Sequence, residues 1–233
     1  MYGWRGRLGL ILPSDNAVVE VDVARRLPEG VSSHVVRLSS GDQRDRMVAE
    51  AVEVAPYLVD ADADVLAYMC AASSFLLGPK GNEDLRARIS EACGGRPTFT
   101  ASTAMADAFR AVGAQRIQVL SPHPPGIAEY LRTYLEEDGF TVAQLTALDM
   151  GLRAINSQYP GDVYRFVRDL EPVSADALFI AATNFRAMDV IAALEDDLGV
   201  PVITSNQVCL WAGLRALGVQ ERLAGLGTLL EEH

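Results

Sequence analysis

Arg-Leu-Gly-Leu-Ile-Leu-Pro at residues 7–13 is an apolar run. Its pattern recurs at residues 116–122, which read Arg-Ile-Gln-Val-Leu-Ser-Pro. Short apolar runs that end at a turn residue are typical of buried strands. Three more matches follow in the same order: residues 63–66 with 175–178, residues 97–100 with 201–204, and residues 110–113 with 215–218. The sequence therefore predicts a duplicated βαβα unit.

Apolar runs alternate with amphipathic segments along the whole chain, which indicates parallel βαβ units. The expected strands are Leu8–Leu12, His34–Leu38, Val65–Met69, Thr98–Thr100, Ile117–Leu120, Thr141–Leu145, Ala177–Ala181 and Val202–Thr204. The expected helices are Arg44–Val59, Glu83–Ala92, Ser102–Val112, Ile127–Asp138, Gly161–Leu170, Ala187–Leu198 and Asn206–Leu217. We expect an α/β fold of two pseudo-symmetric parallel-sheet halves, residues 1–112 and 113–233, with a cleft between them. The helix that ends the first half can cross over to the second.

The amino-acid composition narrows the classes of function that are expected of this protein. The 233 residues carry a net charge of −11, which repels phosphate backbones and argues against a nucleic-acid partner. No apolar run is long enough to span a membrane, and residues 1–6 lack a signal-peptide pattern, so we expect a cytoplasmic protein. Three cysteines and three histidines lie far apart in the sequence. Their spacing predicts no disulfide framework and no bound metal.

Polar residues follow the expected strands, where open parallel sheets bind ligands. Side chains and free helix N–H groups at these turns can hold a carboxylate without Arg or Lys. The same residue types are also ordinary N-caps, and that alternative stays open for each one alone. The predicted substrate-binding residues are Ser14, Asn16, Ala71, Ala72, Ser73, His123, Asn184 and Asn206.

Cys70 is the candidate reactive group. It follows an apolar strand and precedes a small-residue turn, where a helix N-terminus would lower the thiol pKa. A buried core cysteine is the structural alternative, which we favour for Cys93 and Cys209. Adding the repeat offset of about 112 residues to Cys70 leads to Ala182, followed by Thr183. A symmetric two-thiol racemase is therefore disfavoured, and Thr183 becomes the second candidate catalytic residue.

These segments resemble the aspartate/glutamate racemase superfamily, in the branch of maleate cis-trans isomerases and arylmalonate decarboxylases. The resemblance rests on residues 9–16, 68–75, 121–125, 181–186 and 204–207. It implies a cofactor-independent enzyme that acts on a small carboxylate through enolate-like intermediates, in a homo-oligomer. Asn16 and Cys70 match the substrate amide and first catalytic cysteine of that branch, whereas His123 stands where a substrate-binding tyrosine is usual.

Three functions remain open. The first is cofactor-independent isomerisation of a small unsaturated dicarboxylate, in which Cys70 adds to the double bond and Thr183 or His123 assists proton movement. The second is decarboxylation of a substituted malonate, with Cys70 as proton donor and an apolar pocket formed by Phe75, Leu76 and Phe185. The third is a non-catalytic member that binds a carboxylate.

Overall fold

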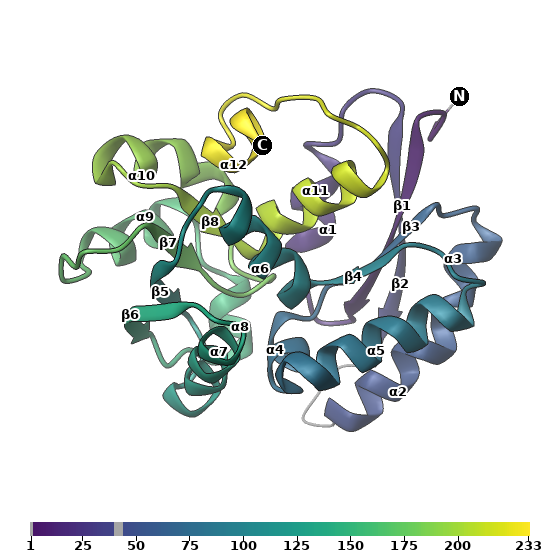
Figure 1. Ribbon diagram of the computed structural model, residues 1–233, viewed down its shortest axis with the longest axis horizontal. Coiled ribbons are helices and arrows are strands. Elements are labelled where there is room, and N and C mark those ends of the chain that lie inside the picture. Colours follow the sequence, from purple (N-terminus) through teal and green to yellow (C-terminus); the bar gives the residue numbers. More distant parts are fainter. Residues whose placement is uncertain (1, 40–43) are drawn as a thin grey trace.

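A computed structural model describes residues 2–39 and 44–233, and it contains two parallel four-stranded sheets (Figure 1). The first sheet has the order β2-β1-β3-β4 and the second has the order β6-β5-β7-β8. The strands are β1 Gly6–Pro13, β2 Val31–Leu38, β3 Val65–Tyr68, β4 Thr98–Thr100, β5 Arg116–Ser121, β6 Thr141–Ala147, β7 Ala177–Ile180 and β8 Val202–Thr204. The predicted α/β class and all eight predicted strands are confirmed, with small shifts at their ends.

Helices cover both sheets. They are α1 Val19–Ala24, α2 Arg44–Val54, α3 Pro56–Asp60, α4 Ala71–Phe75, α5 Gly78–Ala92, α6 Ala101–Ala111, α7 Pro125–Glu137, α8 Leu152–Asn156, α9 Pro160–Arg168, α10 Ile191–Leu198, α11 Ser205–Ala216 and α12 Gly227–Glu232, with a 3₁₀ turn at Met188–Val190. The prediction of a single helix over residues 44–59 is wrong, because this segment forms the two helices α2 and α3. It divides at Pro56, which has no N–H to continue the first helix and instead begins the second. Four helices of five or six residues were not predicted, because such lengths show too little periodicity.

Matching hydrogen bonds in the two halves confirm the repeat. The backbone N–H of Arg7 donates to the Asp64 carboxylate at 2.8 Å, and the Asp64 N–H donates back to the Arg7 carbonyl at 2.9 Å. In the second half, Arg116 and Asp176 make the same exchange, with both distances at 2.7 Å. Each aspartate thus joins the start of one strand to the turn before its neighbour, which explains why Ala-Asp recurs in the sequence.

Helices α6 and α11 are exchanged between the halves and lie side by side in the middle of the molecule (Figure 1). Phe109 of α6 packs edge-on against Phe140 and Phe179 of the second half, with ring centroids 5.3 and 5.4 Å apart. Gly213 of α11 lies so close to Leu8 of β1 that a Cβ there would be 2.8 Å from that side chain. This exchange joins the two cores, and the boundary between residues 112 and 113 stays a prediction.

No helix in the described parts of the chain is both long enough and apolar enough to cross a membrane.

Candidate functional site

The carboxyl ends of the two sheets meet at a buried hydrogen-bonded link. Asn16 follows β1, and its Nδ2 donates to the Thr183 hydroxyl at 2.9 Å. Thr183 follows β7, and its hydroxyl donates to the Met69 carbonyl at 3.2 Å. Asn16 and Thr183 are 3% and 5% exposed, so water does not replace these bonds. Residues from three strand ends are thereby brought together, as the duplicated fold predicts.

Cys70 lies directly after β3 and is the N-cap residue of α4. It is a free, half-buried thiol. Burial raises its pKa above the ordinary value, the hydroxyl and N–H of Ser73 act to lower it, and the charge of Asp15 raises it further. The expected lowering of the thiol pKa is therefore wrong in its net direction, because desolvation outweighs the donors at the start of a short helix. Cys70 therefore rests as a thiol, and the Ser73 hydroxyl donates to the Cys70 backbone carbonyl at 3.2 Å.

Ala182 occupies the position in the second half that is equivalent to Cys70 in the first. The N–H of Met69 donates to Ile11 at 2.8 Å, and the N–H of Ala181 donates to Leu120 at 2.9 Å, so these two residues hold equivalent places. The next residue in each half is Cys70 or Ala182. Ala182 has a φ of +81°, in the left-handed region that side chains other than glycine rarely adopt. The site therefore has one thiol, and its two halves differ in backbone as well as side chain.

Thr183 lies within the site, but its hydroxyl is already used. It accepts from Asn16 and donates its one proton to Met69, the residue before Cys70. A proton given to a substrate would have to leave this buried bond. The geometry favours a positioning role for Thr183, and its predicted catalytic role stays a prediction.

His123 follows β5 and has a neutral imidazole. Burial lowers its pKa to about 4, and its buried Nε2 has no partner among the described residues. Its ring lies edge-on to Phe75 of α4, with centroids 6.4 Å apart. A buried ring nitrogen without a protein partner is suited to bind a polar atom of a ligand.

Further donors can hold a carboxylate at this end of the sheets. Asn184 is 6% exposed, and its buried Nδ2 has no partner among the described residues. The first N–H groups of α4, those of Ala71 and Ala72, have no partner within the helix. These donors come from both halves, and the carboxylate-binding roles of Ala71, Ala72 and Asn184 stay predictions.

Asn206 and Ser14 are less available for substrate binding than the sequence suggests. Asn206 donates its Nδ2 to Asp22 of α1 at 2.8 Å, which leaves its Oδ1 as a buried acceptor without a partner in the described chain. Burial raises the pKa of Asp22, although Asn206 and Arg26 oppose this effect. Ser14 is exposed, and its N–H is bonded to Leu38 at the end of β2. Both residues stay predictions as substrate ligands.

Three residues support the site without having been predicted. Arg37 donates to the Asn16 carbonyl at 2.9 Å, which fixes the turn after β1. Asn156 of α8 donates to the Asp15 carbonyl at 2.9 Å. Tyr68 is fully buried at the end of β3, and its hydroxyl lies 2.6 Å from the Ser73 hydroxyl. In the sequence, Tyr68 reads as a core strand residue, because no local pattern shows which hydroxyl its side chain meets.

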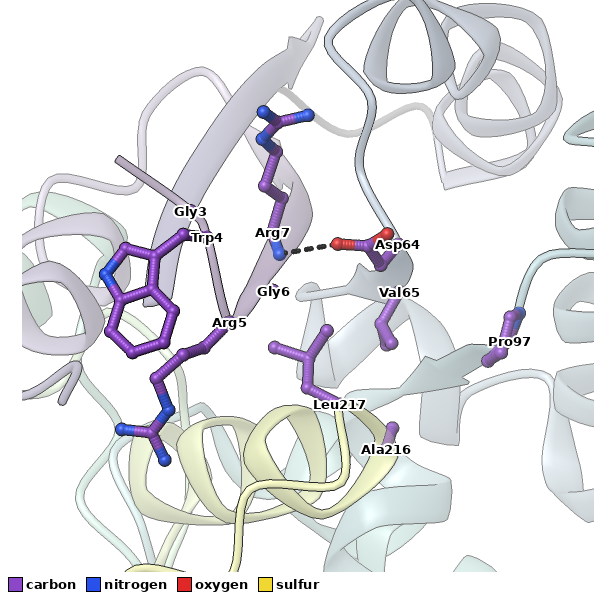
Figure 2. Close-up of a pocket in the computed structure, with 10 residues that line it drawn as sticks. All are labelled: Gly3, Trp4, Arg5, Gly6, Arg7, Asp64, Val65, Pro97, Ala216 and Leu217. Carbon is purple, nitrogen blue, oxygen red and sulfur yellow. Dashed lines mark hydrogen bonds between the residues drawn. The ribbon is translucent and has the colours of Figure 1, made fainter. Parts of the chain in front are cut away.

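A pocket of about 450 Å³ lies at the opposite end of the first sheet, beside the amino ends of β1 and β3 (Figure 2). Its polar groups are engaged in structural bonds. Arg5 pairs with Glu221, Arg7 pairs with Asp62 at 3.1 Å, and Asp64 accepts from the Arg7 backbone. This pocket is remote from Cys70, and we assign it no part in the site.

In the described part of the chain, no three His, Cys, Asp or Glu side chains are grouped so that they could hold a metal. Cys93 and Cys209 are buried in apolar cores, which agrees with the packing roles expected for them.

Together, the fold and site define a duplicated α/β protein with a single strand-end cysteine at the junction of its halves. The arylmalonate decarboxylase family matches residues 8–230, and the chain belongs to this family. It is 27% identical to the maleate isomerase of Nocardia farcinica and 26% identical to the arylmalonate decarboxylase of Bordetella bronchiseptica. Each match covers 97% of this chain and 96% of the relative.

A solved structure of the Nocardia farcinica maleate cis-trans isomerase is also similar. It is a cysteine-to-serine variant with a covalently bound succinylcysteine intermediate. The TM-score is 0.91 and the identity 25%, over 98% of this chain and 99% of that one. The resemblance inferred from the sequence is confirmed, and these relatives are enzymes.

Proposed function

We propose that this protein is a cofactor-independent isomerase of a small unsaturated dicarboxylate, with maleate as the first substrate to test. The observation that carries the proposal is Cys70, a free thiol at a strand end and at the start of α4, in a protein whose described strand ends also carry the unpartnered polar groups of His123 and Asn184. The succinylcysteine intermediate of a similar maleate isomerase supports covalent chemistry at a cysteine.

Different hydrogen-bond donors would hold each of the two carboxylates of the substrate. The N–H groups of Ala71 and Ala72 would hold the carboxylate next to Cys70, because helix N-termini favour anions. The Asn184 amide would hold the second carboxylate, and the neutral His123 ring would bind one of its oxygens. Asn16 and Thr183 keep the two halves in register through their mutual hydrogen bond.

The isomerisation can be completed with one thiol. The Cys70 thiolate forms a C–S bond to one alkene carbon, and the π electrons move into the adjacent carboxylate as an enediolate. The former double bond is now single and rotates. The electron pair returns, the C–S bond breaks, and the thiolate leaves the trans product. No proton is added to carbon on this route, so it requires no second thiol at Ala182.

Conversion of maleate to fumarate, followed by proton NMR, tests the proposal. Cys70→Ser should abolish turnover, whereas Cys93→Ala, the matched control in an apolar core, should retain it. Turnover should rise with pH up to the thiol pKa, because burial raises that pKa and the thiolate is the nucleophile.

Protonation of the enediolate carbon by solvent would divert the intermediate to a stable succinyl thioether. Intact mass measurement with maleate should therefore detect an adduct of one maleic acid on the wild-type chain and none on Cys70→Ser. Full turnover by Cys70→Ser would refute the proposal. Release of carbon dioxide from a substituted malonate, without conversion of maleate, would replace it with the decarboxylase alternative. Carboxylate binding without turnover of either substrate would indicate the non-catalytic alternative.

A further inference from the structure

Arg186 carries a positive charge that is not paired within the described chain. It is half-buried on the loop after β7, two residues beyond Asn184. Its guanidinium has no hydrogen bond or ion pair with a described residue, and its carbon lies 5.8 Å from the centroid of the Tyr159 ring, a cation–π contact. Every other half-buried arginine of the described chain donates to a carboxylate or a carbonyl, as Arg132 does to Glu129.

The carboxylates of the neighbouring segments are already bonded. Asp162, in the first turn of α9, accepts from the Tyr159 N–H at 3.0 Å and pairs with Arg165. Asp189, three residues beyond Arg186, pairs with Arg26 of α1. The charge of Arg186 is therefore available to an anion from outside the chain.

The segment that carries Tyr159 runs along the carboxyl ends of the strands, where the site lies. The N–H of Met150 donates to the Pro122 carbonyl after β5 at 2.9 Å, and Asn156 donates to the Asp15 carbonyl after β1 at 2.9 Å. The Tyr159 ring then meets the loop after β7. The guanidinium is thus held at the same end of the two sheets as the reactive thiol.

An anionic substrate meets an unfavourable field at this end of the protein. The chain has a net charge of −11, and Asp15 is close enough to Cys70 for its charge to raise the thiol pKa. The other polar groups assigned to the substrate, such as the Asn184 amide, are neutral. A free arginine offsets this repulsion, and its Coulomb attraction is twice as large for a dianion as for a monoanion.

We propose that Arg186 is a specificity-determining residue, whose free guanidinium, held over the Tyr159 ring, selects substrates with two carboxylates over those with one. The proposal rests on the proposed function only in taking a small carboxylate as the substrate. It adds a cation to a site for which the sequence suggested neutral donors alone.

The first test compares two alkylating reagents at Cys70, with the product located by peptide mass spectrometry. Iodoacetate is an anion and iodoacetamide is neutral, so the ratio of their rate constants reports the local field and cancels any change in the thiol pKa. At low salt, Arg186→Gln should lower this ratio about two- to threefold, because unit charges several ångströms apart in water interact on that scale. Arg186→Lys should keep the ratio, Tyr159→Ala should lower it by less, and Tyr159→Phe should leave it unchanged.

The second test measures the selection itself, through protection of Cys70 from iodoacetamide. Succinate has two carboxylates, and succinamate has one. In Arg186→Gln, the half-protecting concentration of succinate should rise about four- to ninefold and that of succinamate about two- to threefold, because the factor for a dianion is the square of that for a monoanion.

Arg168→Gln is the matched control. It removes the same charge, but Arg168 lies in the last turn of α9 and pairs with Asp197 at 3.0 Å. We expect its rate ratio and both of its protection curves to equal those of the wild type.

An unchanged rate ratio in Arg186→Gln, or equal rises for succinate and succinamate, would overturn the inference. If Arg186→Gln does not fold, Tyr159→Ala decides, because the Tyr159 ring is exposed. Neither test involves turnover. A protein that does not convert maleate but shows these shifts would contradict the proposed function and leave this inference standing.

Discussion

Thr183→Val removes the hydroxyl that joins the two halves and keeps the side-chain shape. The change breaks the 2.9 Å bond from Asn16 and the 3.2 Å bond to Met69. It leaves a buried amide hydrogen and a buried carbonyl without partners, each costing about 1–3 kcal/mol. We expect a loss of about 2–6 kcal/mol in the free energy of unfolding, a large part of the ~5–15 kcal/mol of a typical protein.

Urea unfolding followed by circular dichroism measures this loss. Thr183→Ser keeps the hydroxyl and should cost only about 1 kcal/mol for the lost methyl group. Adding Asn16→Ala to Thr183→Val should cost less than the sum of the two single changes, because both break the same bond.

Turnover distinguishes a positioning role from a catalytic one. A Thr183→Val protein within about 0.5 kcal/mol of wild-type stability, but inactive on maleate, would refute this reasoning. Its hydroxyl would then act on the substrate and not on the framework.

Three further changes have defined outcomes. Asp15→Asn should lower the Cys70 pKa, measured by the pH dependence of Cys70 alkylation by iodoacetamide, because it removes the negative charge that raises this pKa; a higher pKa would contradict this assignment. Wild-type stability should fall by about 2–3 kcal/mol between pH 6.5 and 4, because the unfolded His123 takes up a proton in this range and the folded ring does not. His123→Gln should flatten that loss in urea titrations, and an unchanged slope would speak against a buried neutral ring. Gly213→Ala should lower the melting temperature through a clash with a buried leucine of β1, whereas Gly126→Ala, a helical glycine with nothing within 4 Å, should raise it.

Local sequence was sufficient for the architecture. The apolar runs around residues 7–13 and 116–122 form the central strands β1 and β5, because alternation of buried strands with amphipathic helices has few other solutions. Short elements escaped this reasoning. α4 has five residues and follows Cys70 directly, so its place is set by tertiary packing and not by periodicity.

The sequence alone determined that Cys70 has no thiol counterpart, since Ala182 stands at the equivalent position in the second copy of the duplicated unit. It also determined which polar residues lie at the strand ends, because that follows from the order of strands and turns. Only the tertiary structure decided which of these groups are free. Thr183 and Asn206 are bonded across the halves, Asn184 is not, and Tyr68 reaches Ser73. The reason is that hydrogen-bond partners distant in sequence meet only when the two sheets pack, and burial then sets the pKa of Cys70.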